Sequence, residues 1–231
     1  MSAPIELHTW VTPNGYKVSI ALEEMGLPHE VRWVNIGKNE QFAPEFLALS
    51  PNNRIPAILD PEGPDGAPIT LFESGAILQY LGRKTGKFYP EDPRARAEVE
   101  QWLFWQMGGV GPMAGQAHHF LRFAPEDVPY GKKRYGDEVT RLYTILDKRL
   151  AGRDFVAGEY SIADMALWPW VRLWEMQAQD ISGLKNLAAW LERVGARPAV
   201  QRGLIGQDEA KRVNPSAPSL ARRLFDAGKI G

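Results

Sequence analysis

The sequence contains no cysteine, and this absence constrains its chemistry more than any other feature of the composition. Structural disulfides, thiolate nucleophiles, CxxC redox pairs and cysteine-ligated zinc are all excluded. If the protein carries out thiol chemistry, the sulfur must therefore come from a ligand.

Long apolar runs and an excess of charge are also missing. No run approaches the roughly 18 apolar residues that a membrane span requires, and the formal net charge is only -1. Such a chain has no general attraction to nucleic acid or acidic membranes. Residues 1–10 lack a basic region followed by an apolar one, so no secretion signal is expected. We therefore expect a cytoplasmic protein with neither nucleic acid nor membrane as a partner.

The 231 residues are enough for one large or two small domains. The first part alternates between strands and helices in the order β-α-β-α-β-β-α, and its β-α-β first half favours parallel pairing. The expected strands and helices occupy residues 5–10, 16–25, 30–34, 42–49, 55–59, 69–72 and 74–86, in that order.

The strand patterns end at a proline-containing segment at residues 89–93, which we interpret as an interdomain linker. The second part is helix-periodic and divides into about four or five helices. Breaks are expected near residues 108–111, 124–129 and 151–153. We assign residues 1–88 to an α/β domain, 94–205 to an all-helical domain and 206–231 to an irregular C-terminal extension.

Motifs along most of the chain resemble the glutathione transferase superfamily. The sequence reads NRIPAI at 53–58, FESGAI at 72–77 and SIAD at 161–164. More narrowly, TPNG at 12–15, SPNN at 50–53 and QWLFWQ at 101–106, continuing through His119, resemble the bacterial Nu class, which is related to the yeast regulator Ure2. The resemblance covers roughly residues 4 to 203. It implies a thioredoxin-like βαβαββα domain followed by a helical bundle, with glutathione as a substrate and no metal cofactor.

The resemblance also implies which residues bind glutathione. Glu73 would contact the ammonium and Ser74 the carboxylate of the γ-glutamyl end, and Gln41 would lie near the glycine end. From composition alone, Ser74 fits the N-cap of a helix whose positive end suits a carboxylate, although a capped helix needs no ligand. Lys38 also follows the second strand, but a solvated loop explains it equally well.

Pro56 has no amide hydrogen, so it requires an edge or turn position. From the residues alone, a trans turn proline is the more common state. The resemblance instead implies a cis Ile55–Pro56 bond that exposes the N–H and C=O of Ile55 to the cysteinyl backbone of glutathione.

Thr12 and Asn14 lie where the first strand turns into the first helix, and we predict them as the catalytic residues. Pro13 suits the first helical position, which makes Thr12 the expected N-cap. A thiolate placed there would meet a hydroxyl, free amides and the positive helix end. Tyr16 lies inside the helix rather than at its start, so we favour Thr12 and Asn14 over it.

Several features of the helical part have competing interpretations. The glycines at 108–111 could line a dimer cleft or mark a helix kink or end. The adjacent histidines His118 and His119 could suggest a metal site, but neighbouring imidazoles on a helix point to different faces. The Nu-class resemblance implies that Arg134 reaches the glutathione site, and a solvent-facing arginine is the alternative. The motif Ser161-x-x-Asp164 fits a capping box with a purely structural role.

Without a cysteine, two kinds of glutathione chemistry remain: nucleophilic transfer to an electrophile, and disulfide exchange in which bound glutathione supplies the sulfur. The Nu-class resemblance favours a glutathione-dependent disulfide reductase with transferase or peroxidase activity alongside. The alternative is a non-catalytic glutathione-binding regulatory or interaction module. A chloride-channel-like relative is not favoured, because such a protein would need a cysteine and an apolar span, and this sequence has neither. The expected partners are a small-molecule electrophile or disulfide and a second copy of the chain, because members of the superfamily are usually homodimers.

Overall fold

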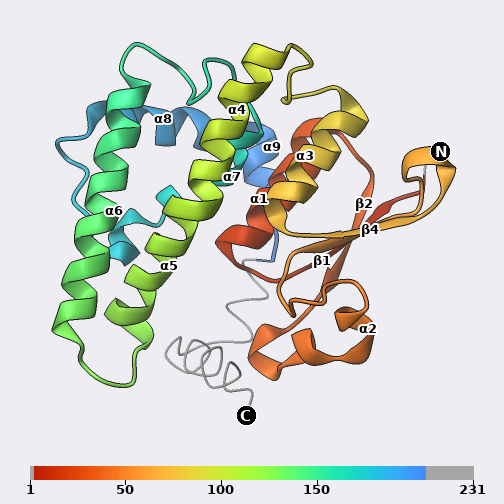
Figure 1. Ribbon diagram of the computed structural model, residues 1–231, viewed down its shortest axis with the longest axis horizontal. Helices are drawn as coiled ribbons and strands as arrows, with labels where there is room; N and C mark the ends of the chain where they lie inside the picture. Colours follow the sequence, from red (N-terminus) through yellow and green to blue (C-terminus); the bar gives the residue numbers. More distant parts are fainter. Residues whose placement is uncertain (1–2, 207–231) are drawn as a thin grey trace. The chain divides into compact units, whose positions relative to one another are not determined.

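The computed structural model describes residues 3–206 and separates them into two compact units (Figure 1). One unit contains the chain up to Thr85 together with the segment that begins at Ala199, and the other is Gly86–Pro198. The predicted C-terminal extension at 206–231 lies outside the described residues, apart from Gly206. None of the helices in the described part of the chain is both long and apolar enough to cross a bilayer.

The first unit is built on a four-stranded mixed sheet in the order β2-β1-β3-β4. β1 pairs in parallel with β2, whereas β1 with β3 and β3 with β4 are antiparallel. This arrangement confirms the βαβαββα order, the parallel pairing of its first half and the thioredoxin-like fold. Its elements are β1 (Ile5–Thr9), α1 (Pro13–Met25), β2 (His29–Trp33), α2 (Pro44–Leu47), β3 (Ala57–Asp60), β4 (Ile69–Phe72) and α3 (Ser74–Thr85).

Burial in this unit follows the strand period. Ile5, Leu7 and Thr9 of β1 are buried, and the residues between them are only partly covered. Helices α1 and α3 contact each other and the sheet, and their apolar side chains complete the core. β3 begins at Ala57 rather than at residue 55 as predicted, because Pro56 has no N–H with which to extend the ladder.

The last described helix, α9 (Pro198–Gly203), packs on α1. The hydroxyl of Ser19 donates to the carbonyl of Gly203 at 2.6 Å. A Cβ on Gly203 would lie 2.7 Å from the Cα of Ile20, so only glycine permits this approach. Arg202 adds an ion pair to Glu23 at 2.6 Å. The end of the described chain therefore packs against α1, the helix that Thr12 caps.

The second unit is helical throughout its main elements. These are α4 (Pro93–Trp105), α5 (Gly111–His118), α6 (Pro129–Leu150), α7 (Ile162–Val171) and α8 (Lys185–Gly195), with a 3₁₀ turn at Trp174–Gln177. The predicted breaks at 124–129 and 151–153 are confirmed.

Near residues 108–111 the α-helical pattern is interrupted as predicted, although the chain stays helical through the interruption. The chain passes from α4 to α5 through a π-helical turn at Gln106–Val110, and a second π turn follows at His119–Phe123. A Cβ on Gly111 would lie 2.8 Å from Nε2 of Gln106, so the glycine accommodates close packing within a continuous helix. This outcome is a local helix distortion of the kind that often accompanies functional sites.

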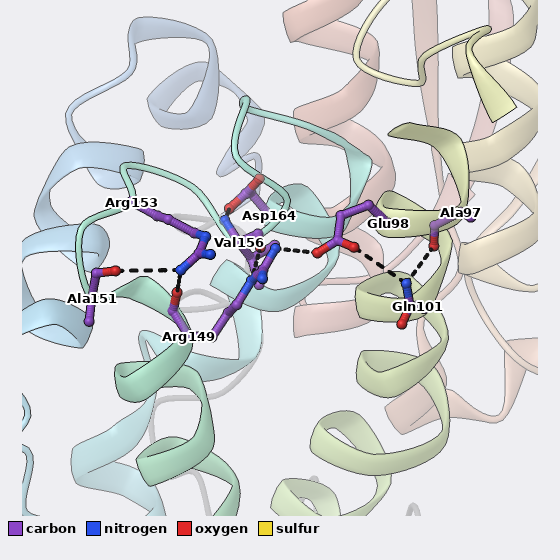
Figure 2. A network of polar contacts seen from close by, with 8 residues as sticks. All are labelled: Ala97, Glu98, Gln101, Arg149, Ala151, Arg153, Val156 and Asp164. Carbon is purple, nitrogen blue, oxygen red and sulfur yellow. Dashed lines mark hydrogen bonds and ion pairs between the residues drawn. The ribbon is translucent and has the colours of Figure 1, made fainter. Parts of the chain in front are cut away.

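The predicted capping box is confirmed at the start of α7, where it fixes the core of the second unit. The Asp164 carboxylate accepts hydrogen bonds from the backbone N–H of Ser161 at 3.1 Å and of Val156 at 3.0 Å, and from the indole of Trp190 at 2.9 Å. Figure 2 shows how Val156 continues this network, since its carbonyl accepts from Arg149, which also pairs with Glu98. Burial raises the pKa of Asp164 to about 6.

Candidate active site

The turn from β1 into α1 places Thr12 at the N-cap, as predicted. The Thr12 hydroxyl oxygen accepts a hydrogen bond from the N–H of Gly15 at 3.1 Å, and Pro13 occupies the first turn. A Cβ on Gly15 would lie 2.4 Å from the carbonyl oxygen of Trp10, so a side chain at this position would displace the turn. Since a hydroxyl has one proton and two lone pairs, Thr12 can accept from Gly15 and still donate outward.

The other two residues of this turn have different environments. Asn14 is partly buried in the first turn of α1, next to the cap. Tyr16 is only 5% exposed, so its ring packs inside the unit as expected from its position within the helix. The structure therefore brings Thr12 and Asn14 together at the start of α1, and their catalytic role stays a prediction.

The Ile55–Pro56 peptide bond is cis, as the resemblance implied. Ile55 precedes the first ladder residue of β3, and its side chain packs beside Val34, Phe46 and Ala57. Within residues 3–206, no hydrogen bond to the N–H or C=O of Ile55 is found. The role of the Ile55 backbone in binding stays a prediction.

Glu73 and Ser74 lie at the start of α3, but Ser74 is not the N-cap that its composition indicated. α3 begins at Ser74, and the carbonyl of Glu73 accepts the first helical hydrogen bond from Ile77 at 2.9 Å. Glu73 has a left-handed φ of 68° and is exposed, whereas Ser74 is 4% exposed. The pair thus presents a carboxylate at the surface and a hydroxyl beneath it, beside the positive end of a 12-residue helix.

Gln41 lies in a short 3₁₀ turn and is only 1% exposed. Its side-chain oxygen is buried and accepts no hydrogen bond from the residues that the structure describes. Buried polar atoms without a partner are uncommon, so Gln41 stays a candidate for a contact with a ligand. Lys38, which lies in the preceding turn, is exposed as a solvated loop residue would be.

One buried side chain in this unit was not predicted as part of the site. Lys17 is 1% exposed, and its ammonium donates to the Ser74 hydroxyl at 3.4 Å. Burial lowers the pKa of Lys17 to about 7, although the negative charge of Glu73 opposes this effect. Helix α1 is buried on every side from Gly15 to Leu22, and a charged residue inside such a stretch was the signal that could have revealed it.

The remaining predicted residue, Arg134, belongs to the second unit, where it is exposed on α6. His118 of the same unit is 9% exposed, its Nε2 has no described hydrogen-bond partner, and burial lowers its pKa to about 4. No group of three potential metal ligands occurs within the described part of the chain. The role of Arg134 stays a prediction.

Comparison with known proteins decides the family. Residues 12–84 match the glutathione S-transferase N-terminal domain, and residues 129–193 match the glutathione S-transferase C-terminal domain. The chain belongs to the glutathione S-transferase family. The resemblance stated from the sequence motifs is thereby confirmed, and so is the fold class.

Among curated members of the glutathione S-transferase family, this chain is 50% identical over 203 residues to the disulfide-bond oxidoreductase YfcG of Escherichia coli, covering 87% of this chain and 94% of YfcG. It is 41% identical over 216 residues to the disulfide-bond oxidoreductase YghU of the same organism, covering 87% of this chain and 74% of YghU.

Solved structures of the family give the same picture. A glutathione transferase from Pseudomonas putida, with one glutathione disulfide bound per subunit, is 48% identical, covers 87% of this chain and 91% of its own, and has a TM-score of 0.84. A glutathione transferase from Burkholderia graminis, with two glutathione molecules bound per subunit, is also 48% identical, covers 88% of each chain and has a TM-score of 0.84.

Proposed function

We propose that this chain is a glutathione-dependent disulfide-bond reductase that also acts as a glutathione transferase. The observation that carries the proposal is the hydroxyl of Thr12 at the start of α1, in a family member that has no cysteine of its own. The relatives YfcG and YghU are disulfide-bond oxidoreductases, and the two similar solved structures hold glutathione disulfide or glutathione.

The chemistry needs no sulfur from the protein. The thiolate of one glutathione attacks a sulfur of the substrate disulfide, and the other substrate sulfur leaves as a thiolate that takes up a proton. The first exchange leaves glutathione joined to one substrate sulfur as a mixed disulfide. A second glutathione thiolate then attacks the glutathione sulfur of this mixed disulfide. The products are glutathione disulfide and the second substrate thiol. Two glutathiones thus lose the two electrons and two protons that the substrate gains.

The catalytic contribution of the protein is to favour the thiolate. A free thiol has a pKa near 8.5, so ionisation at neutral pH requires a shift worth about 2 kcal/mol. Hydrogen bonds from Thr12 and Asn14 to a charged sulfur, at roughly 1.5–3 kcal/mol each, are sufficient. The hydroxyl of Thr12 is well placed, because its lone pair is already used by Gly15 and its proton can point to the ligand.

The binding contribution in this proposal follows the resemblance. The Ile55 backbone, next to Pro56, holds the cysteinyl residue of glutathione, and Glu73 and Ser74 hold its γ-glutamyl end. Gln41 lies toward the glycine end, and Arg134 of either the same or a neighbouring subunit completes the site. Residues 1–88 then form the glutathione-binding domain.

The test is glutathione-dependent reduction of a small disulfide, such as 2-hydroxyethyl disulfide, by wild-type protein and by Thr12→Val. We expect Thr12→Val to lose at least tenfold in turnover while keeping most of its glutathione affinity, and Thr12→Ser to retain activity. The matched control is Thr70→Val, which alters an exposed threonine of β4. Binding of glutathione without any turnover by the wild type would refute the enzyme and favour the non-catalytic binding module.

We also propose that the protein is a homodimer. Large apolar side chains are exposed on the second unit, at Phe104 (60%), Tyr130 (78%) and Met176 (40%), and a partner subunit would cover such surface. Light scattering at micromolar concentration should give about twice the 25.9 kDa chain mass. A monomer mass would contradict the dimer and would leave Arg134 only its own site.

A further inference from the structure

The feature that the proposed function does not use is the buried lysine beneath Ser74. Lysine is almost never fully buried without a compensating partner. Lys17 is 1% exposed, and its Nζ lies 3.4 Å from the Ser74 hydroxyl oxygen, 57 positions away in the chain. The two residues meet because α1 and α3 pack together. A cation is thereby held directly behind a hydroxyl at the start of α3.

The direction of the hydrogen bond determines what Ser74 can do. An ammonium has donors only, so the Ser74 oxygen accepts from Lys17 and the hydroxyl proton must point elsewhere. A hydroxyl polarised in this way is a better donor to an anion. The positive end of α3 favours negative charge at the same place. Lysine, serine and helix end therefore all favour a carboxylate on the outer side of Ser74.

Burial, opposed by one nearby charge, brings the pKa of Lys17 close to neutrality. Burial lowers its pKa to about 7, and the charged group that opposes this effect is Glu73, just before α3. On α1 the first turn has no acidic residue, and Glu23 near the other end pairs with Arg202 of α9. A carboxylate arriving at Ser74 adds a negative charge, which favours the protonated lysine.

We propose that Lys17 is a positioning residue for the γ-glutamyl carboxylate of glutathione, acting through Ser74, and that it takes up a proton when glutathione binds. This inference rests on the proposed function, because it assigns a residue to the glutathione site. Glutathione binding then becomes weaker as the pH rises above neutrality, since the proton must be drawn from an increasingly basic solution. The thiol has the opposite tendency, because a bound thiolate releases its proton.

The experiment therefore uses S-methylglutathione, whose sulfur cannot ionise. Its binding is measured by titration calorimetry at pH 7.5 in phosphate and in Tris, two buffers with different heats of ionisation, so that the difference gives the number of protons taken up. The variants are Lys17→Met and Lys17→Arg. The matched control is Lys148→Met, which alters an exposed lysine at the end of α6.

We expect wild type and Lys148→Met to bind S-methylglutathione with a clear fractional proton uptake. Lys17→Met should bind at least tenfold more weakly with smaller uptake, and Lys17→Arg should keep more of the affinity, because arginine stays charged. In the reductase assay, Lys17→Met should raise KM for glutathione and leave kcat nearly unchanged.

Two results would overturn the inference, and they are distinguishable. If wild type binds S-methylglutathione but Lys17→Met matches it in both affinity and proton uptake, Lys17 has no such role and the proposed function stands. If wild type binds neither S-methylglutathione nor glutathione, the proposed function fails together with the inference.

Discussion

Replacing Lys17 with methionine should stabilise the protein at neutral pH, although it weakens glutathione binding. The pKa of Lys17 falls from 10.5 to about 7 on folding because the side chain is buried. At 1.36 kcal/mol per pH unit, this difference corresponds to a destabilisation on the order of 5 kcal/mol at pH 7. Methionine has a similar length and no charge, and its loss of the hydrogen bond to Ser74 costs about 1 kcal/mol. A net gain of several kcal/mol is therefore expected.

The pH dependence identifies the cause. Between pH 7 and 10.5 the unfolded lysine stays protonated while the folded one loses its proton, so the unfolded state binds more protons. The free energy of unfolding of the wild type should therefore rise relative to Lys17→Met by up to about 1.4 kcal/mol per pH unit. The advantage of the variant should be greatest at or below pH 7 and should disappear toward pH 10.5.

Urea unfolding followed by circular dichroism at pH 6.5, 7.5, 8.5 and 9.5 measures this difference. Lys148→Met, an exposed substitution, should stay within about 0.5 kcal/mol of wild type at every pH. A Lys17→Met protein that is less stable than wild type at pH 7, or a difference that does not change with pH, would refute the reasoning. Either result would mean that the buried ammonium is better compensated than its surroundings indicate.

Three further predictions concern the site and the core. Tyr16→Phe should leave reductase turnover nearly intact, because the ring is buried in the unit, and a crippled Tyr16→Phe beside a healthy Thr12→Val would reverse the catalytic assignment. Ser74→Ala should weaken glutathione binding by roughly 1–2 kcal/mol, about the worth of a hydrogen bond to a charged group, and unchanged affinity in calorimetry would remove Ser74 from the site. Asp164→Ala should lower the free energy of unfolding by more than about 3 kcal/mol, since it leaves the buried donors of Val156 and Trp190 unsatisfied; a urea midpoint equal to that of wild type would contradict this.

The sequence by itself determined the features that depend on neighbouring residues. Thr12 followed by proline identified the start of α1, and Ser161 with Asp164 identified the start of α7. These predictions succeeded because a cap is satisfied within three residues of the chain. The family motifs added the cis bond before Pro56, which the residues alone would have assigned as trans.

Only the tertiary structure decided which polar groups are buried and which helix ends are real. Lys17 meets Ser74 across 57 residues, Gln41 is enclosed in a short 3₁₀ turn, and α9 returns to pack on α1. The sequence predicted a break at residues 108–111, and the structure shows it to be a π turn between α4 and α5 rather than a loop. A local pattern shows which face of a helix or strand is buried, but it does not show which distant segment packs there, and this packing decides the partners of Lys17 and Gln41.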